Sequence, residues 1–557
     1  MKTSIIILTF NQLHYTKLCI DSIRKYTEKD TYEIIVVDNH STDETVQWLK
    51  NQEDIKTILN KENLGFPKGC NQGIKIAQGD NILLLNNDVI VTPNWLSNLN
   101  KCLYSSDDIG AVGAVTNYCS NYQTIKGAYK NTEEMIDFAK KNNLSNKDEW
   151  EERLKLIGFC MLIKKNVLEK VGTLDEIFSP GNFEDDDYSF RIRKAGYKLM
   201  LCKDVFIYHF GSISFNENRN KFSEIFTVNK KKFEEKWGFS TSYYSDIQVD
   251  LINLIDHFQF EKINVLEIGC GFGSTLLQIK NVYKNAGLYG IELNKKTLEI
   301  TRAFADIQCI DIEKEDPPYA EEFFDYILLG NTLEHLYDPL NVLKNIRKYL
   351  KKEGKILMSI SNVIHYNIIR NLLNGDWRPV HHFLKTPIRF FTINEIDTML
   401  KTAKYSIEIV TGKITQQHED DKQFINSLNQ IIGKDMTSQY KYCEYYIKSK
   451  KFESASGENT EIKFLLRRIE NDILVEESIT CLIEMLHKCK LDLYTIMKLI
   501  DVAIIKKEKV FNQLAAQLYK KSMYEYANVL LAKSYEMNPQ HMETQKLLKC
   551  MEGEHPC

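Results

Sequence analysis

The sequence has no long hydrophobic run and no excess of charge of either sign. Its first apolar stretch, Ile5–Leu8, is far shorter than the apolar region of a signal peptide, and no stretch approaches the length of a membrane span. The 72 lysines and arginines nearly balance the 76 aspartates and glutamates, which leaves a net charge of −4. We therefore expect no membrane span and no electrostatic affinity for nucleic acid or anionic lipid.

The sequence also lacks paired cysteines. Its 13 cysteines are odd in number and scattered, and no two of them form a Cys-x-x-Cys pair. A disulfide framework or a zinc site would need regular pairs. The pattern thus predicts reduced thiols and a cytoplasmic protein.

At 557 residues the chain is too long for one hydrophobic core, so three or four domains are expected. Changes of pattern along the chain predict domains at residues 1–240 and 247–452 and a helical region at 458–557. The junctions between them are the aromatic stretch Phe239–Ser245 and the polar linker Ser454–Asn459.

Buried strands and helical patterns alternate at the start of the chain. The continuous apolar runs Ser4–Thr9 and Glu33–Asp38 are typical of buried strands, and helical spacing follows each of them in Asn11–Thr27 and Asp43–Lys50. This alternation predicts an α/β fold with a doubly wound sheet. Ligands bind beyond the carboxyl ends of the strands in such sheets.

A third apolar stretch, Ile82–Val91, is interrupted by Asn86, Asn87 and Asp88. A carboxylate between two apolar runs is costly to bury unless it binds a cation or a strong donor. The alternative is a turn aspartate that caps a helix at Pro93–Leu99. Polar residues also follow the first two strands, which is more than chance capping would give, so a binding site is expected at this edge.

Seven motifs in order resemble those of the family 2 inverting glycosyltransferases. They are SIIILTFNQLHYTKLCIDSI, EIIVVDNHSTDETVQWL, NLGFPKGCNQGI, LLLNNDVIVTPNWL, GAVGAVTNYCSNYQ, GFCMLI and GNFEDDDYSFRIRKAGY, and they cover residues 1 to about 215. The resemblance implies a nucleotide-sugar-binding α/β domain of the GT-A type with an Asp-x-Asp metal site.

The resemblance also implies roles for single residues. Asp38 would hold the nucleoside base of a UDP- or dTDP-sugar, and Asp88 would hold Mg²⁺ or Mn²⁺ on the diphosphate. The first position of the Asp-x-Asp pair is Asn86 here, so the metal needs other ligands, and the family often has a histidine where His209 stands. The remaining predicted donor-binding residues are Thr9, Asn11, Asn71 and Asn87.

Asn71 belongs to a glycine-rich segment, Asn63–Ile74, with glycines at positions 65, 69 and 73. Glycine permits the backbone to approach a ligand closely, and Asn71 could then reach the sugar or the ribose. The alternative is an ordinary loop before a helix at Gln72–Ala77.

Four consecutive acids, residues 184–187, open a predicted helix that ends at Gly196. Acids at this position suit the helix dipole, which alone would explain the run. The dipole should also lower a carboxylate's pKa and keep it ionised as the base that an inverting transfer needs. The family places its base at the Asp of a Glu-Asp pair, which is Asp185 here; Asp187, four residues before Arg191, is the alternative.

A second strand-and-glycine pattern begins in the middle of the chain. A predicted amphipathic helix, Ile247–Phe258, precedes a buried strand, Asn264–Ile268, and a Gly-x-Gly-x-Gly sequence starts at Gly269. The next strand, Gly287–Glu292, ends in an acid about twenty residues on, the spacing of a ribose-binding carboxylate. A nicotinamide-binding domain would share these features.

The motifs VLEIGCGFG, GIELN, CIDI, FDYILLGNTLEHLYDP and GKILMSISNV resemble, in order and spacing, the class I S-adenosylmethionine-dependent methyltransferases. The resemblance covers about 250–450 and implies a Rossmann-like domain that binds S-adenosylmethionine. Gly269 and Gly271 would meet the methionine part, Glu292 the ribose and Asp311 the adenine edge. Glu267, just before the glycines, completes the predicted set.

Two departures leave open whether this domain methylates. Related methyltransferases attached to sugar transferases often carry Asp-x-Thr-His-x-Arg-Phe-Phe-Thr, whereas this chain reads LKTPIRFFT at Leu384–Thr392, without the Asp and the His. A base for methyl transfer could be His335 or His365, although His335 is expected in a helix after the fourth strand, where packing is the favoured role.

Helical patterns dominate the last hundred residues. The spacing over roughly 508–541 matches one tetratricopeptide repeat, in Phe511, Leu514, Ala515, Leu518, Ala527, Leu531, Ser534 and Pro539. One repeat cannot bury its own face, so it would pack on degenerate neighbours, and it would suggest docking to a protein. A plain helical hairpin is the alternative.

The whole sequence predicts a cytoplasmic bifunctional enzyme. One domain would transfer a sugar, by resemblance rhamnose from a dTDP donor, to a glycan or glycoprotein, and the other would methylate that glycan. Tethering the two raises their effective concentration on one growing chain. A glycosyltransferase with a non-catalytic binding or assembly module, and a scaffold of inactive folds, are the competing hypotheses.

Overall fold

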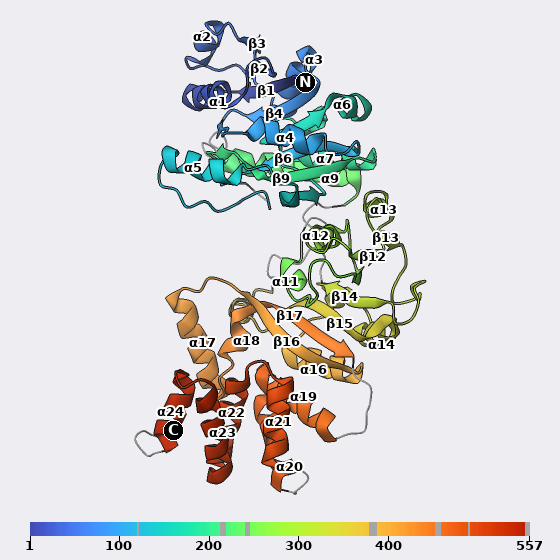
Figure 1. Cartoon of the computed structure of the whole chain (residues 1–557), viewed down its shortest axis with the longest axis vertical. Helices are drawn as coiled ribbons and strands as arrows, with labels where there is room; N and C mark the ends of the chain where they lie inside the picture. Colours follow the sequence, from blue (N-terminus) through green and yellow to red (C-terminus); the bar gives the residue numbers. More distant parts are fainter. Residues whose placement is uncertain are drawn as a thin grey trace. The chain divides into compact units, whose positions relative to one another are not determined.

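The computed structural model (Figure 1) describes residues 1–119, 122–211, 219–239, 246–377, 387–451, 458–487 and 491–551. Most of both predicted junctions, Phe239–Ser245 and Ser454–Asn459, therefore lies outside the described residues. No helix in these ranges is both long and apolar enough to cross a membrane.

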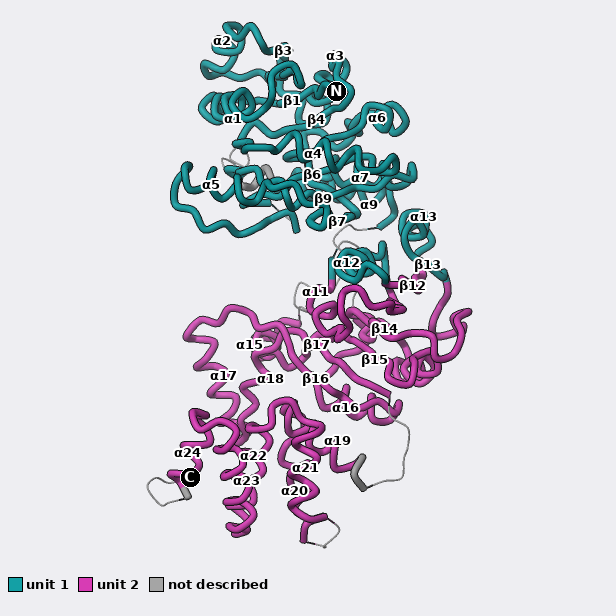
Figure 2. The backbone as a smooth tube through the Cα atoms, viewed as in Figure 1, with its two compact units in different colours: residues 1–247, 270–285, 294–309 teal, residues 248–269, 286–293, 310–557 magenta. Residues whose placement is uncertain are grey.

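Compactness divides the chain into two units (Figure 2). The first contains residues 1–247 together with 270–285 and 294–309, and the second contains 248–269, 286–293 and 310–557. The first unit therefore includes three elements that follow the glycine-rich sequence, α12 (Ser274–Val282), α13 (Lys295–Thr301) and β13 (Asp306–Gln308). The predicted domain boundaries stay predictions.

The first unit is built on a mixed sheet. Its strands run in the order β3 (Ile55–Leu59), β2 (Tyr32–Asp38), β1 (Thr3–Thr9), β4 (Asn81–Asn86), β8 (Cys160–Lys164), β6 (Ile109–Val115), β9 (Lys198–Phe206) and β7 (Trp150–Arg153). The first four are parallel, whereas β8 and β7 run antiparallel to their neighbours. The predicted strands at residues 4–9 and 33–38 are confirmed.

Apolar residues on both faces of this sheet are buried, as continuous apolar strands require. Along β1, Ile5 and Ile7 belong to one hydrophobic cluster and Ile6 to another. The helices of the unit are α1 (Leu13–Tyr26), α2 (Thr45–Lys50), α3 (Phe66–Ile76), α4 (Trp95–Leu103), α5 (Thr132–Asn142), α6 (Lys165–Val171), α7 (Glu184–Lys194) and α9 (Arg219–Trp237).

The glycine-rich segment is a helix for most of its length, which corrects its interpretation as a loop. Helix α3 already begins at Phe66. A Cβ on Gly69 would lie 2.2 Å from Leu8 Cδ1, and one on Gly73 would lie 2.6 Å from Ile6 Cγ2. These two glycines therefore let the helix pack closely on the sheet.

The sheet of the second unit runs in the order β12 (Gly287–Ile291), β11 (Asn264–Ile268), β14 (Phe324–Gly330), β15 (Leu350–Ser361), β17 (Tyr442–Lys451) and β16 (Tyr405–Ile414). Strand β17 is antiparallel to both neighbours, and the others are parallel. The helices are α11 (Val249–Ile252), α14 (Pro339–Ile346), α15 (Tyr366–Leu373), α16 (Ile393–Thr402), α17 (Glu419–Ile432) and α18 (Thr437–Lys441).

The amphipathic helix predicted at 247–258 is wrong beyond its first turns, because α11 ends at Ile252. The backbone N–H of Asp256 donates to the hydroxyl of Tyr326 at 3.0 Å instead of continuing the helix. The Asp256 carboxylate also pairs with Lys355 and Lys448. Tertiary contacts to the sheet thus override the local helical pattern.

The C-terminal region is helical, as predicted. It contains α19 (Glu458–Glu470), α20 (Val475–His487), α21 (Leu493–Ala503), α22 (Lys507–Lys520), α23 (Tyr524–Met537) and α24 (Met542–Met551). Helices α22 and α23 form the expected hairpin, and the predicted repeat positions Phe511, Ala515, Ala527 and Leu531 are buried in it. The tetratricopeptide identity and the docking role stay predictions.

Candidate functional site

Strand register brings the predicted donor-binding residues to one edge of the first sheet. Thr9 lies opposite Asp38, and Leu8 lies opposite Asn86. The Asp38 carboxylate is 1% exposed; its Oδ2 accepts from Ser41 N at 3.0 Å, and its buried Oδ1 has no hydrogen-bond partner among the described residues. A buried, unused acceptor at a sheet edge suits an N–H donor of a ligand.

The neighbouring polar residues bind mainly to one another. Thr9 Oγ1 lies 2.9 Å from Thr16 Oγ1, and the Asn87 amide donates to the same hydroxyl at 3.1 Å. Asn11 has a left-handed backbone, φ 54°, and its Oδ1 accepts from Thr42 N at 2.7 Å. These contacts fix the edge of the sheet, and the direct contacts with a donor stay predictions.

A two-stranded sheet places His209 beside Asp88. Strand β5 (Val89–Ile90) pairs antiparallel with β10 (Tyr208–His209), so that Val89 lies opposite His209. As a result His209 Nε2 lies 3.2 Å from Asp88 Oδ1. Both side chains are buried.

The surroundings of His209 suit a metal ligand. Its Nδ1 lies 2.9 Å from the carbonyl of Tyr118, which assigns the hydrogen to Nδ1, and its buried Nε2 has no well-aligned hydrogen-bond partner. Burial acts to lower the pKa of His209, but the neighbouring Asp88 carboxylate outweighs it and raises that pKa. An imidazole nitrogen and a carboxylate oxygen facing one point fit Mn²⁺ or Mg²⁺.

The Asp88–His209 pair supplies only two of the ligands that a divalent metal needs. No group of three or more histidine, cysteine, aspartate or glutamate side chains that could hold a metal occurs within the described ranges. Any further ligands would therefore come from elsewhere, such as a donor diphosphate and water.

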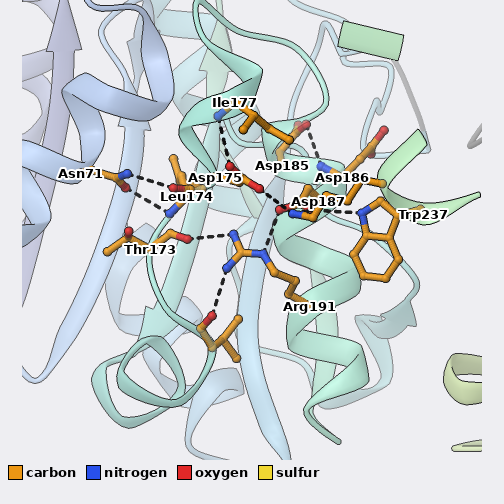
Figure 3. A network of polar contacts seen from close by, with 12 residues as sticks. Asn71, Thr173, Leu174, Asp175, Ile177, Asp185, Asp186, Asp187, Arg191 and Trp237 are labelled. Carbon is orange, nitrogen blue, oxygen red and sulfur yellow. Dashed lines mark hydrogen bonds and ion pairs between the residues drawn. The ribbon is translucent and has the colours of Figure 1, made fainter. Parts of the chain in front are cut away.

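The acidic run opens α7 and comprises residues with different surroundings (Figure 3). Asp185 is half-buried; its Oδ2 accepts from Gly158 N at 3.0 Å and its Oδ1 from Asp186 N at 2.9 Å. Lys155 pairs with Asp186 at 2.8 Å. Gly158 opens the GFCMLI motif, whereas Lys155 lies outside every motif of the sequence that indicated a site.

Burial, and next to it the charge of Asp186, raises the pKa of Asp185 to about 6. Lys155 and the hydrogen bonds to the carboxylate act in the opposite direction without cancelling the effect. The expectation that the helix dipole lowers this pKa is therefore wrong, because desolvation outweighs the dipole. A carboxylate with a pKa near 6 is still ionised at neutral pH and is a stronger base than an ordinary aspartate.

Asp187 lies two residues further on and is fully buried. Its Oδ2 accepts from Arg191 Nε at 2.8 Å, and its Oδ1 accepts from Trp237 Nε1 at 2.9 Å, as Figure 3 shows. Lys236 pairs with the same carboxylate. Asp187 thus ties α7 to α9, with both oxygens engaged.

Asn71 is also held by the protein (Figure 3). Its amide accepts from Leu174 N at 3.1 Å and donates to Leu174 O at 2.9 Å and to Glu176 at 3.0 Å. These bonds fasten the segment at 174–176 to α3. A contact between Asn71 and a sugar stays a prediction.

Residues 158 and 159 join the two halves of the site. Gly158 N bonds Asp185, while the ring of Phe159 stacks on His209 with centroids 5.5 Å apart. The carbonyl of Phe159 accepts from Asn86 N at 2.9 Å. The acidic helix, the histidine and the end of β4 therefore meet at one short segment.

The second unit has its own sheet edge. Ile268 lies opposite Ile291, so Gly269 and Glu292 follow the two strands at the same side, and Gly269 N donates to Ile291 O at 2.8 Å. Gly269 has φ 76°, and a Cβ on it would lie 3.1 Å from Thr332 Oγ1, a residue the sequence did not single out.

Glu267 and Glu292 are both buried. A buried carboxylate beside a positive-φ glycine turn suits the ribose and methionine parts of S-adenosylmethionine. Gly271, in the first unit, also has a positive φ of 53°. Asp311 is engaged locally by Lys314 at 2.8 Å, and that hydrogen bond is the main reason its pKa is lowered.

His335 and His365, the two candidate bases for methyl transfer, have different surroundings. His365 is buried, and burial lowers its pKa to about 4, so it is neutral at pH 7. His335 lies in a short 3₁₀ turn, Leu333–His335, where a helix was expected. Residues 384–386 of the predicted LKTPIRFFT segment lie outside the described residues.

Comparison with known proteins finds two matches that follow one another along the chain. The sequence profile of glycosyl transferase family 2 matches residues 4–172, and that of a methyltransferase domain matches residues 243–408. The chain thus carries an N-terminal glycosyl transferase family 2 domain, followed by a methyltransferase domain.

Individual relatives match one domain at a time. The low-salt glycan biosynthesis hexosyltransferase Agl10 of Haloferax volcanii is 24% identical over 266 residues, 46% of this chain and 81% of that protein. The malonyl-[acyl-carrier protein] O-methyltransferase of Bacillus anthracis is 20% identical over 233 residues, 39% of this chain and 85% of that protein. The matches to curated relatives span from 15% to 85% of the relatives' length.

Among solved structures, a mannosyltransferase from Pyrobaculum calidifontis in complex with GDP-Man and Mn²⁺ is similar with a TM-score of 0.29 and 20% identity. The similarity covers 37% of this chain and 56% of that one. At such a TM-score it carries no argument about function.

Proposed function

We propose that the N-terminal domain transfers a sugar, with inversion at the anomeric carbon, from a nucleotide-sugar donor to a glycan or glycosylated protein. The observation that carries this proposal is the convergence on residues 158–159 of the buried Asp88–His209 pair and the half-buried Asp185. A charge-binding pair and a base with a pKa of about 6 are what such a transfer needs in one place.

The residues have separate tasks. Asp38 accepts a hydrogen bond from the nucleoside base at the end of β2. Asp88 and His209 would hold a divalent metal, and such a metal would supply positive charge beside the diphosphate of the donor. Asp185 takes the proton of the acceptor hydroxyl as its oxygen attacks the anomeric carbon. A UDP- or dTDP-linked sugar, rhamnose among them, is the donor to test.

We propose in the same way that the second domain binds S-adenosylmethionine through Glu292 and the Gly269 turn and methylates the glycan. This chain has Leu384 and Pro387 where the related Asp-x-Thr-His-x-Arg-Phe-Phe-Thr motif has the Asp and the His, which favours the second candidate, a domain that binds without transfer. Methyl-labelled S-adenosylmethionine with the isolated glycan separates the two: binding without label in the glycan supports the module.

The test of the first activity needs no acceptor. A panel of UDP-, dTDP- and GDP-sugars is incubated with the full chain and Mn²⁺ or Mg²⁺, and hydrolysis of the donor by water is measured. Hydrolysis of one donor that disappears in EDTA supports the proposal. The absence of hydrolysis and of any thermal shift with every donor would contradict it.

A further inference from the structure

A large cavity lies in the first unit, next to the acidic run but outside the donor edge. It measures about 600 Å³ and is lined by three segments: Cys119 and residues 122–124 after β6, residues 152–155 of β7 and its continuation, and the first turns of α12. Residues 246–247 close it on another side. This volume falls within the range of about 300–1,000 Å³ typical of small-molecule sites.

The walls combine an exposed aromatic ring with fixed polar groups. Tyr122 is 46% exposed, and its hydroxyl is held by Ile247 N at 3.2 Å. Arg153 lies over the Tyr122 ring at 5.9 Å and donates to Gln278 Oε1 at 2.7 Å. The Nε–H of Arg153 is buried and has no partner among the described residues.

This lining matches the chemistry of a sugar ring. The C–H face of a pyranose packs on an aromatic ring, and its hydroxyls pair with planar amide and guanidinium groups whose orientation is already fixed. Three of the charged side chains that line the cavity form ion pairs: Glu152 with Arg193 and Lys280, Arg153 with Glu151, and Lys155 with Asp186. A polyhydroxylated, uncharged ligand therefore fits better than an ionic one.

The segment at residues 155–158 connects the cavity lining to the proposed base, Asp185. Lys155 lines it and binds Asp186, and three residues later Gly158 binds Asp185. Gln123, also in the lining, accepts from Ile157 N at 2.8 Å and so holds this segment in place. The hydroxyl that Asp185 deprotonates must lie beside it, so an acceptor sugar has to occupy space next to this segment.

One wall comes from the methyltransferase domain of the sequence. Helix α12 belongs to the first compact unit, as Figure 2 shows in teal. Asn281 of α12 accepts from Glu152 N at 3.0 Å and donates to Glu152 O at 3.0 Å. The helix is therefore hydrogen-bonded to the backbone of β7. Gln278 stands one turn before Asn281 and lines the cavity.

We propose that this cavity is the acceptor site for a neutral pyranosyl residue of the glycan and that α12 forms one of its walls through Gln278. The inference rests on the proposed sugar transfer. It implies that the acceptor of the first reaction touches a helix of the domain proposed to methylate it.

Binding of the full chain to a printed array of neutral glycans tests this proposal. Tyr122→Ala and Gln278→Ala are expected to reduce binding at least fivefold, whereas Tyr122→Phe keeps the ring and retains binding. Gln47→Ala and Tyr494→Ala, which change exposed residues of the same types far along the chain from the cavity segments, serve as matched controls. Melting temperatures establish that each variant is folded.

Two outcomes overturn the proposal: no neutral glycan binds, or bound glycans are retained in both Tyr122→Ala and Gln278→Ala. Donor hydrolysis by the unmodified chain is measured in parallel. If hydrolysis is present and array binding fails, only the acceptor site is wrong; if hydrolysis is absent, the proposed transfer itself fails.

Discussion

The two sheet edges of this protein are assembled over different distances in the sequence. In the second unit, Gly269 and Glu292 come from neighbouring strands that follow each other along the chain. In the first unit, Asp88 meets its partner His209 only because β5 and β10 pair across more than a hundred residues. The residues of a site formed by consecutive strands can be predicted from their spacing in the sequence. Spacing does not predict a residue that a distant strand contributes.

Helix α7 shows the same contrast at short range. Asp185 and Asp187 are two residues apart, yet one is half-buried with backbone partners and the other is fully buried between Arg191, Lys236 and Trp237. Equal residue types in one acidic run thus separate into a candidate base and a structural anchor.

The largest expected effect is on the distant pair. Asp88→Ala should reduce donor hydrolysis by roughly 10³-fold, because the carboxylate that holds the metal on the diphosphate is lost. His209→Ala should reduce it as well, and it should raise the metal concentration needed for half-maximal activity. Initial rates measured over a series of Mn²⁺ concentrations give the rate and the metal requirement of each variant. Hydrolysis that does not depend on metal in either variant would contradict the metal site at Asp88 and His209.

The two aspartates of α7 should separate activity from stability. Asp185→Asn is expected to reduce sugar transfer by about 10²- to 10⁴-fold, the usual contribution of a general base, with little change in melting temperature. Asp187→Asn leaves Arg191 and Lys236 without their buried counter-charge and should cost about 3–5 kcal/mol of unfolding free energy. The test measures transfer rates and urea unfolding of both variants. An equal loss of stability in both would contradict the assignment of Asp185 as the base and Asp187 as a structural residue.

The pH profile reports on the same base. Because the pKa of Asp185 is raised to about 6, the carboxylate is protonated below that pH and ionised above it. The kcat/KM of transfer should therefore fall about tenfold per pH unit below pH 6 and level off above it. A profile that stays flat down to pH 4.5 would indicate a base with an ordinary pKa.

Metal binding without the donor should be weak. The described residues offer one carboxylate and one imidazole, so the free enzyme supplies few of the six ligands Mn²⁺ prefers. Calorimetric titration should give a Kd for Mn²⁺ that drops at least tenfold when UDP or dTDP is present. Equally tight binding to the empty enzyme would show ligands beyond this pair.

The smallest effect is expected at the contiguous edge. Glu292→Gln keeps the size of the side chain but loses the charge-assisted acceptor for ribose hydroxyls, which should raise the Kd for S-adenosylmethionine about tenfold. Glu299→Gln, an exposed glutamate that follows β12, is the matched control. Unchanged affinity in Glu292→Gln would remove this residue from the cofactor site.

Sequence patterns alone predict the first strands, the order of the two α/β domains and the helical C-terminal region. Those features follow from local periodicity: continuous apolar runs such as Ser4–Thr9 must be buried on both faces, and the observed β1 is. Strand ends then define where Asp38 and Asp88 stand, because parallel strands present their carboxyl ends at one edge.

The contacts of each polar residue, by contrast, depend on the tertiary structure. Asn71 and Asp187 are engaged by Leu174 and Trp237, and Gly69 faces Leu8, contacts that no local pattern contains. The raised pKa of Asp185 likewise comes from desolvation by surrounding elements, whereas the helix dipole predicted from sequence acts in the other direction. Burial and charge pairing depend on segments far apart in the chain, so they appear only once the chain is folded.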